Sequence, residues 1–505
     1  MAVTGLLVFL SFLTFSSALI EGNCVNHDTG LKWLASKLSS GAAISCLGSP
    51  LQQYNAGRYW GAQYGKNASV VIFPVTAQDV SYAVQASCKT PLGNNLAFVS
   101  GAHGQTNASS STGMVIDLTW MNKTTIEQNK VIDGKSYTVV GYQGGATWGQ
   151  VQTATNGTGY TPIGARVSNV GTGGFSTGGG IGFLAGAYGY AIDRLRAMDV
   201  VLMDGRIVTA TAKNKYSDLF WALQGGGGQF GIVTTFYQEA AAEPTDARFG
   251  VWYISNSTTA VARQNTVDFF NNHTDPFSLM YYATGYVPLA DGTLGTQTLL
   301  VGVWFGNPNN PSQPSFNKTF TPLLHGLDIV QNITIQVPYA DAFQVIDTFF
   351  PYGFRRGFWG PQTTEITASY LANASATLTS YVSSLLARGE TPYPPSGLSS
   401  TCLQASTATS PPPTQPPLAD DAVTSAENDV LNALTYSHQQ SVGPFLADYP
   451  NYISPNASGR RVWGENVERL IEVKAKYDPQ CRIHQGRVFA SRQCVQGGWA
   501  NIFPN

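Results

Sequence analysis

Short apolar runs and helical repeats alternate through the first half of the chain. Residues 70–74 and 96–99 are apolar and rich in β-branched or aromatic side chains, as buried strands are. Between them, Thr76 is suited to cap a helix, and the acidic Asp79 follows three residues later. Val80, Ala83, Val84 and Ser87 then recur at helical spacing. The pattern predicts a strand–helix–strand unit over residues 70–99.

A β-hairpin is predicted further on. Residues 195–202 and 206–210 are strand-like segments that flank Asp204-Gly205, a dipeptide that favours a tight hairpin turn. The other elements predicted before residue 240 are a helical segment followed by a loop at 24–60, strands at 114–118 and 137–141, a turn at 144–148 and a short helix at 218–223.

The pattern changes after residue 240. Alternating runs at 297–305 and 333–337 predict a sheet. Residues 465–477 form an amphipathic repeat that Asp478-Pro479 ends, with Val467, Leu470, Ile471 and Ala475 on one face. The other predictions are helices at 374–386 and 423–434 and a proline-rich surface loop at 410–417.

Residues 167–182 are the most unusual stretch, because seven of the sixteen are glycine and none is charged. Each glycine costs about 1 kcal/mol in a helix interior, so the composition argues against a helix there. The flanks are apolar, which argues against a linker. Glycine in apolar surroundings indicates the close approach of another backbone or of a ligand, and free N–H groups can bind an anion such as pyrophosphate. A tightly packed turn without a ligand stays an alternative.

Composition narrows the function classes. The 505 residues carry a net charge of −2 and only 11% are charged, so no basic excess points to nucleic acid or to an anionic membrane. Residues 6–15 are apolar and precede Ser16-Ser17-Ala18, which predicts a signal peptide over residues 1–18 rather than a longer membrane anchor.

Sequons and cysteines agree with a secretory route. Six cysteines suggest disulfides, and we favour Cys46 with Cys88, while the pairing among Cys24, Cys402, Cys481 and Cys494 stays open. Their spacing gives no metal motif, so no metal is expected. The ten predicted glycosylation sites are Asn67, Asn107, Asn122, Asn156, Asn256, Asn272, Asn317, Asn332, Asn373 and Asn456.

Three further stretches carry candidate chemistry. The predicted strand at 96–99 runs into residues 100–105, where His103 stands among small residues. Residues 224–234 contain four consecutive glycines. Residues 448–452 bring two phenols and an amide together, as either catalytic or packed groups. Each stretch alone is weak support for a functional site, since a single histidine or tyrosine is more often structural.

Together, the order and spacing of residues 73–80, 100–104, 170–180 and 226–233 resemble the FAD-binding domain of the vanillyl-alcohol oxidase superfamily. Within it the chain resembles the berberine bridge enzyme-like group, whose closing helix is similar to residues 463–479. The resemblance implies an α+β fold with a two-part FAD-binding domain of the PCMH type. The implied domains are residues 19–240 for FAD binding, 241–440 for a substrate domain with an antiparallel sheet covered by helices, and 441–505 for a return to the FAD domain.

The resemblance also implies roles for residues. His103 would attach the flavin covalently, and Tyr452, with Tyr449 as the second choice, would be the active-site tyrosine. The implied FAD-binding residues are Val99, Ser100, Gly101, Ala102, Gly104, Gln105, Val170, Gly171, Gly173, Gly174, Gly178, Gly179, Gly180, Gly182, Gly231, Ile232, Val233 and Asn451.

The chain departs from the family at three positions. Relatives with two flavin bonds carry Cys where Val167 stands and often His where Phe175 stands, so we expect one bond, through His103, and no cysteinyl bond. Where the family usually has Gly-Gly-His, the middle residue here is Ala102, whose methyl group could perturb the close approach.

The expected function is that of a secreted FAD-dependent oxidase. It would take two electrons from an alcohol, amine or activated C–H of a small secondary metabolite, with hydride passing to flavin N5 and O2 being reduced to H2O2. The alternatives are oxidation of a mono- or oligosaccharide at C1, a dehydrogenase that uses another acceptor, and a non-catalytic secreted binding glycoprotein. The expected partners are a small-molecule substrate and O2, without nucleic acid, membrane or metal.

Overall fold

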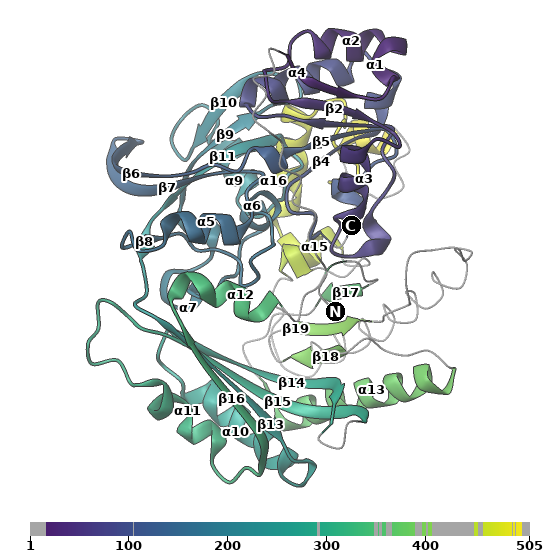
Figure 1. The fold of residues 1–505 in the computed structure, drawn as a ribbon. Coiled ribbons are helices and arrows are strands. Elements are labelled where there is room, and N and C mark those ends of the chain that lie inside the picture. Colours follow the sequence, from purple (N-terminus) through teal and green to yellow (C-terminus); the bar gives the residue numbers. More distant parts are fainter. Residues whose placement is uncertain are drawn as a thin grey trace.

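A computed structural model of the chain describes residues 17–104, 106–289, 293–347, 352, 356–359, 366–388, 396–399, 402–406, 449–452, 458–486, 488–489 and 491–496. Figure 1 shows two parts, with two sheets and their helices above and one larger sheet below. The C-terminal segment, in yellow, returns to the upper part. The predicted signal peptide up to residue 16, the loop at 410–417, the helix at 423–434, Gln105 and Asn456 lie outside the described residues.

The first sheet holds the strand–helix–strand unit predicted at residues 70–99. Its strand order is β1 (Leu19–Glu21), β2 (Ala43–Cys46), β3 (Val70–Phe73), β5 (Met114–Asp117) and β4 (Leu96–Val99). The interior strands β2, β3 and β5 are buried along their whole length, as strands covered on both faces are. Helix α4 (Ala77–Ser87) begins with the predicted capping box of Thr76 and Asp79.

The second sheet is antiparallel and lies beside the first. Its order is β10 (Ile207–Thr211), β9 (Leu195–Val201), β11 (Ile232–Glu239), β7 (Lys135–Gln143) and β6 (Thr124–Ile132). The β9–β10 pair is the predicted hairpin, and Gly205 in its turn has φ +87°. Val201, Met203 and Ile232 join the core of the first sheet, which fixes the two sheets together.

The third sheet has seven strands, and every pair in it is antiparallel. Its order is β16 (Ile329–Val337), β13 (Ala247–Ile254), β15 (Leu294–Phe305), β14 (Ser278–Pro288), β18 (Ser396–Ser399), β19 (Cys402–Ser406) and β17 (Arg356–Trp359). Helices α10 (Thr259–Asn272), α11 (Phe316–Leu324) and α13 (Ala368–Ala387) lie along one face (Figure 1). The other face packs against the upper part through residues such as Phe249 and Val303.

The C-terminal segment supplies the predicted amphipathic helix as α16 (Asn466–Tyr477). The remaining helices are α1 (Cys24–His27), α2 (Thr29–Ala35), α3 (Pro50–Gly57), α5 (Trp148–Thr155), α6 (Thr172–Thr177), α7 (Ala185–Tyr188), α8 (Ala191–Arg194), α9 (Ser217–Leu223), α12 (Ala342–Asp347), α15 (Gly459–Trp463) and α17 (Arg492–Gln496). Strands β8 (Tyr160–Thr161) and β12 (Ala241–Ala242) form a small separate pair. The 3₁₀ turns are η1 (Ala62–Tyr64), η2 (Pro91–Asn95), η3 (Asn107–Ser109), η4 (Leu118–Trp120), η5 (Asn256–Thr258), η6 (Tyr339–Asp341) and η7 (Pro450–Tyr452).

The predicted disulfide between Cys46 and Cys88 is wrong. Cys46 pairs with Cys24, with 5.7 Å between their Cα atoms, whereas Cys88 is an exposed free thiol. The reason is the parallel pairing of β1 with β2, which aligns Glu21 with Ser45 and so brings Cys46, the last residue of β2, close to Cys24 at the start of α1. A second disulfide joins Cys481 to Cys494.

Two other expectations need correction. The glycine-rich stretch contains the short helix α6, so its glycine content did not exclude helix. The segment at 24–60 contains strand β2, whose residues are all buried. Within the described part of the chain, no helix combines the length and the hydropathy needed to cross a membrane.

Candidate functional site

The site is built where the loop after β4 crosses the glycine-rich stretch. A Cβ atom on Gly101 would lie 2.1 Å from the backbone nitrogen of Gly171, and one on Gly171 would lie 2.0 Å from that of Gly101. Only glycine allows the two backbones to come this close. The backbone N–H of Gly173 also donates to the hydroxyl of Ser100 at 3.2 Å. The two predicted loops therefore form one structural unit.

A buried ion pair between Arg58 and Asp117 holds the loop at residues 100–104. Asp117, at the end of β5, is fully buried and accepts hydrogen bonds from Arg58 at 2.8 and 3.1 Å. Arg58 also donates to the backbone carbonyl of Ser100 at 2.6 Å. Burial opposes the charge on Arg58, but the carboxylate of Asp117 outweighs it and the pKa of Arg58 is raised. Arg58 therefore stays charged and ties the loop to the first sheet.

His103 lies in an aromatic setting. Its ring stacks on Trp60, with the ring centres 5.3 Å apart, and it is nearly perpendicular to the ring of Tyr352, with the ring centres 5.5 Å apart. The backbone N–H of Trp60 donates to the carbonyl of Ala102 at 3.1 Å. These contacts place the imidazole against two aromatic rings, an arrangement that suits a reacting or covalently attached side chain.

Ala102 adopts the backbone conformation that a glycine would favour. Its φ is +55°, in the left-handed region, and its side chain is buried. An L-residue pays about 1–2 kcal/mol for this conformation. The departure from Gly-Gly-His that the sequence revealed is therefore accommodated in the fold, with backbone strain as its consequence.

Some glycines of the site lack a packing partner, which is what a ligand-binding backbone requires. A Cβ atom on Gly174, Gly225 or Gly227 would meet nothing within 4 Å. A positive φ accounts for glycine at positions 225 and 227. Gly174 is exposed and has no positive φ, so neither packing nor backbone conformation requires glycine there. Bare backbone beside the crossing of the two loops fits a bulky cofactor with a pyrophosphate group.

The C-terminal segment reaches the glycine-rich stretch through Tyr449 and Asn451. The phenol oxygen of Tyr449 accepts hydrogen bonds from the backbone N–H groups of Gly180 and Ile181, at 2.9 and 3.0 Å, and from Asn451 at 2.9 Å. Asn451 also donates to the carbonyl of Phe175 at 3.3 Å. Tyr449 is buried, and this burial raises its pKa.

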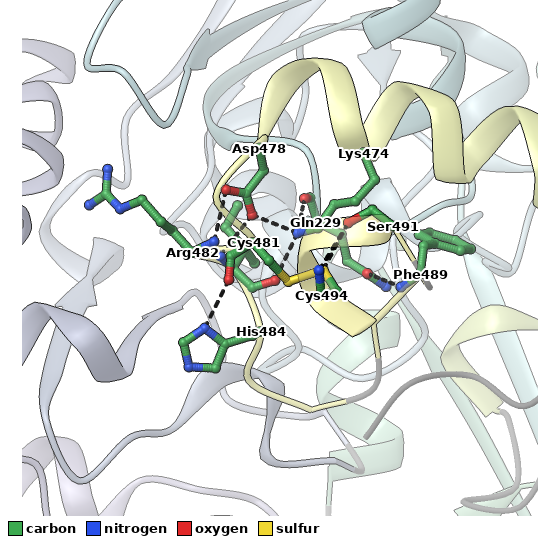
Figure 2. A network of polar contacts seen from close by, with 10 residues as sticks. Gln229, Lys474, Asp478, Cys481, Arg482, His484, Phe489, Ser491 and Cys494 are labelled. Atoms are coloured by element: carbon green, nitrogen blue, oxygen red, sulfur yellow. Dashed lines mark hydrogen bonds and ion pairs between the residues drawn. A yellow bond between two sulfur atoms is a disulfide. The ribbon is translucent and has the colours of Figure 1, made fainter. Parts of the chain in front are cut away.

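The glycine-rich loop at 224–231 is held by α16 through Lys474, which lies next to Gln229 (Figure 2). Lys474 is fully buried and donates to the carbonyl of Gln229 at 2.9 Å, to the carbonyl of Ile483 at 2.8 Å and to Asp478 at 2.7 Å. Burial lowers the pKa of Lys474. Within the same loop, Gly225 and Gly227 both donate to the carbonyl of Thr177, so the loop is tied to α6 as well.

At the start of the glycine-rich stretch, Ser168 contacts helix α12, and the preceding Arg166 contacts strand β14 of the third sheet. Asp347, at the end of α12, accepts hydrogen bonds from the backbone N–H of Ser168, at 2.9 Å, and from the Ser168 hydroxyl. Arg166 donates to the hydroxyl of Tyr281 on β14 at 2.9 Å. The stretch is therefore contacted by both parts of the molecule.

Most of the predicted site residues lie together around this crossing, but some are placed by packing. Ile232 and Val233 are buried in the core, so only their backbone could reach a ligand. A Cβ on Gly182 would lie 2.1 Å from the carbonyl oxygen of Gly164, and one on Gly178 would lie 2.0 Å from Asn451. Tyr452 lies in η7, next to Asn451, and its side chain lies outside the described residues.

Sequence reasoning missed the groups that hold the site in place. These are Arg58, Trp60, Asp117, Asp347 and Lys474. Asp117 could have been found from the sequence, because an aspartate at the end of a predicted buried strand needs a partner for its charge. The burial of Lys474 had no such signal, because lysine in an amphipathic helix is usually exposed.

The sequence matches two family models. The first is described as an FAD binding domain and covers residues 68–211; the second is described as berberine and berberine like and covers residues 448–483. The two matches contain both sides of the site, since one includes His103 and the glycine-rich stretch and the other includes Tyr449 and α16.

Two curated relatives match parts of the chain. The FAD-linked oxidoreductase pgmH of Aspergillus terreus is 37% identical over 187 residues, which cover 37% of this chain and 36% of the relative. The FAD-dependent monooxygenase sdcF of Emericella nidulans is 28% identical over 321 residues, which cover 63% of each. The chain thus spans less than two thirds of the length of these relatives.

Solved structures share the fold over almost the whole chain. The 6-hydroxy-D-nicotine oxidase of Arthrobacter nicotinovorans has a TM-score of 0.70 at 20% identity and covers 89% of this chain and 98% of its own. The glucooligosaccharide oxidase of Acremonium strictum, described with a 6-S-cysteinyl, 8α-N1-histidyl FAD, has a TM-score of 0.65 at 19% identity, with coverage of 90% and 98%. At these identities the likeness shows the fold alone.

Proposed function

Since the chain belongs to the berberine bridge enzyme-like FAD-linked oxidoreductases, we propose that it is a secreted oxidase of a small secondary metabolite. The observation that carries this proposal is the crossing at Gly101 and Gly171, which leaves the backbone of Gly104 and Gly174 exposed beside a restrained His103. The substrate would be an alcohol, an amine or a molecule with an activated C–H bond.

The chain's own residues would hold the FAD from two sides. Residues 100–104 and the N–H groups around Gly173 and Gly174 would receive the pyrophosphate, because small residues leave these backbone groups accessible. His103 would form one covalent bond to the flavin. Val167 and Phe175 are apolar and buried, so neither would add a second bond. When bound, the flavin accepts two electrons from the substrate and passes them to O2.

The two tyrosines would have different roles. A general base must accept a proton from the substrate, so its oxygen must be accessible and its pKa must not be far above the working pH. The oxygen of Tyr449 already accepts three hydrogen bonds, and burial raises its pKa. We therefore assign Tyr449 to positioning the glycine-rich stretch and Tyr452 to proton transfer from the substrate.

The substrate would lie between the glycine-rich stretch on one side and Tyr281 of β14 and Asp347 of α12 on the other. The absence of a thiol at Val167 separates the chain from the cysteinyl-linked glucooligosaccharide oxidase. This difference favours a metabolite over a sugar as the substrate. A sugar oxidised at C1 is the second candidate.

The test begins with the covalent bond. The secreted protein and its His103→Ala variant would be acid-precipitated, and the flavin fluorescence of the denatured chain would be measured. We expect fluorescence on the wild-type chain and its loss in the variant. Flavin that acid releases from the wild type would refute the covalent bond, and absence of flavin in every preparation would favour a binding glycoprotein.

The fate of oxygen separates two activities. An oxidase reduces O2 to H2O2 in proportion to substrate consumed, whereas a monooxygenase, as sdcF is named, places one oxygen atom in the product. Peroxide measurement together with ¹⁸O2 incorporation distinguishes them in one substrate screen. Turnover with an artificial acceptor and without O2 consumption would indicate a dehydrogenase.

A further inference from the structure

The edge strand β16 is uncharged and exposed along most of its length, whereas the equally long edge strand β6 carries charged residues. Its sequence, Ile329–Val337, contains no charged residue, and five consecutive residues, 330–334, are exposed. Consecutive exposure in a strand means that both faces are open to solvent, because neighbouring side chains point to opposite faces. Val330 is 51% exposed and Ile333 is 36% exposed.

Among the described strands, β16 pairs only with β13, so the hydrogen-bonding groups of its outer edge are available. Such an edge can pair with the same strand of a second copy. Proteins usually prevent this with charges, prolines or bulges along the edge. The equally long edge strand β6 has these features, since Glu127 and Lys130 form an ion pair and a register shift lies between them. The register shift in β16 lies at its start, next to Val330, and leaves the rest of the strand regular.

In place of charges, β16 carries the sequon Asn332-Ile333-Thr334 at its centre. Asn332 is exposed and opposite Trp252 of β13. The hydroxyl of Thr334 donates to the amide oxygen of Asn332 at 3.4 Å, so both functional residues of the sequon lie on the same face of the strand. A large hydrophilic group attached at the middle of this uncharged edge would shield more of its backbone from pairing than a group at either end.

We propose that Asn332 carries an N-linked oligosaccharide that covers the edge of β16 and keeps the protein monomeric. The sugar would come from a lipid-linked oligosaccharide pyrophosphate in the secretory pathway. A bond forms between the amide nitrogen of Asn332 and the anomeric carbon of the first sugar, the bond from that carbon to the pyrophosphate oxygen breaks, and the amide loses one proton. The proposal rests on the proposed secretory route but not on the flavin chemistry.

The test compares variants of the full chain secreted from a eukaryotic host. Asn332→Gln and Thr334→Ala each remove the sequon by a different change. Asn256→Gln, in the exposed turn η5 of the same part of the molecule, is the matched control. Occupancy is measured by peptide mass spectrometry, and molecular mass by light scattering over a range of protein concentrations.

We expect Asn332 to be occupied in the wild type, both sequon variants to shift from monomer to dimer or larger species, and the control to stay monomeric. Adding Val330→Lys to Asn332→Gln should restore the monomer, because a charge on the edge replaces the sugar. An unoccupied Asn332, or sequon variants that stay monomeric, would overturn the proposal. Equal association of the Asn256→Gln control would indicate a general effect of glycans on solubility and would overturn it too.

Failure of this proposal can be told apart from failure of the proposed function. Flavin content and peroxide production are measured on the same wild-type sample. A protein with flavin and activity but no sugar at Asn332 refutes only the edge proposal. A glycosylated monomer without flavin refutes only the oxidase.

Discussion

The phenol oxygen of Tyr449 lies 2.9 Å from the backbone nitrogen of Gly180, although 269 positions separate the two residues in the chain. This contact closes the site, because it joins the C-terminal segment to the glycine-rich stretch. A Cβ on Gly179 would lie 2.8 Å from the Tyr449 ring, so the ring and the glycine turn fit directly against each other.

Replacing Tyr449 by Phe should therefore weaken the fold and flavin retention. The change leaves the buried N–H of Gly180 and the half-buried N–H of Ile181 without their acceptor, at a cost of about 1–3 kcal/mol in the free energy of unfolding. Denaturant unfolding and flavin content measure both effects. The control is Tyr452→Phe, which should retain stability and flavin but lose turnover. If Tyr449→Phe alone abolished turnover at full stability and flavin content, the two roles would be reversed.

Ala102→Gly should stabilise the protein. The left-handed conformation at φ +55° is strained for alanine and accessible to glycine, and the gain, reduced by the greater freedom of glycine in the unfolded chain, is about 1 kcal/mol. Thermal unfolding measures it. Ala260→Gly is the control, because Ala260 is exposed in α10 and the change there should destabilise the helix. If Ala102→Gly destabilised the protein as Ala260→Gly does, the strain inferred at Ala102 would be contradicted.

Lys474→Met should destabilise the protein by about 3–5 kcal/mol, because it removes the only cation that pairs with the fully buried carboxylate of Asp478 among the described residues. The loop containing Gln229 loses an anchor in the same step. The control is Lys476→Met on the same helix, where the pair with Asp218 is at the surface and worth about 0–1 kcal/mol. Urea unfolding of both variants gives the comparison, and similar losses would show that the burial of Lys474 is unimportant.

His484 should make stability depend on pH. Burial lowers the pKa of His484 below its ordinary value of 6.5, so the unfolded chain binds the proton more readily than the folded one. Stability is then full above pH 6.5 and falls as the pH decreases from there to the lowered pKa. His484→Gln should make this decline shallower, while the exposed His325→Gln should not. The free energies of unfolding are measured between pH 5 and 8 in steps of about 0.5 pH. The same pH dependence in His484→Gln and in the wild type would contradict the role of His484.

Local patterns in the sequence predicted much of the fold. The capping box at Thr76 and Asp79, the hairpin turn at Gly205 and the strand at 96–99 were all confirmed. They could be predicted because each depends on residues within one turn or one strand of each other. The loop containing His103 and the glycine-rich stretch could likewise be singled out, since small residues after a strand and dense glycine are visible in the sequence.

Contacts between distant segments were decided by the tertiary structure alone. Cys46 pairs with Cys24 because β1 lies parallel to β2, and no spacing in the sequence shows that pairing. Lys474 is buried because Gln229, Ile483 and Asp478 surround its ammonium group with acceptors. The sequence thus determined which local elements form and which positions in the chain carry candidate groups. The arrangement of those groups in space depends on long-range packing, which only the folded chain establishes.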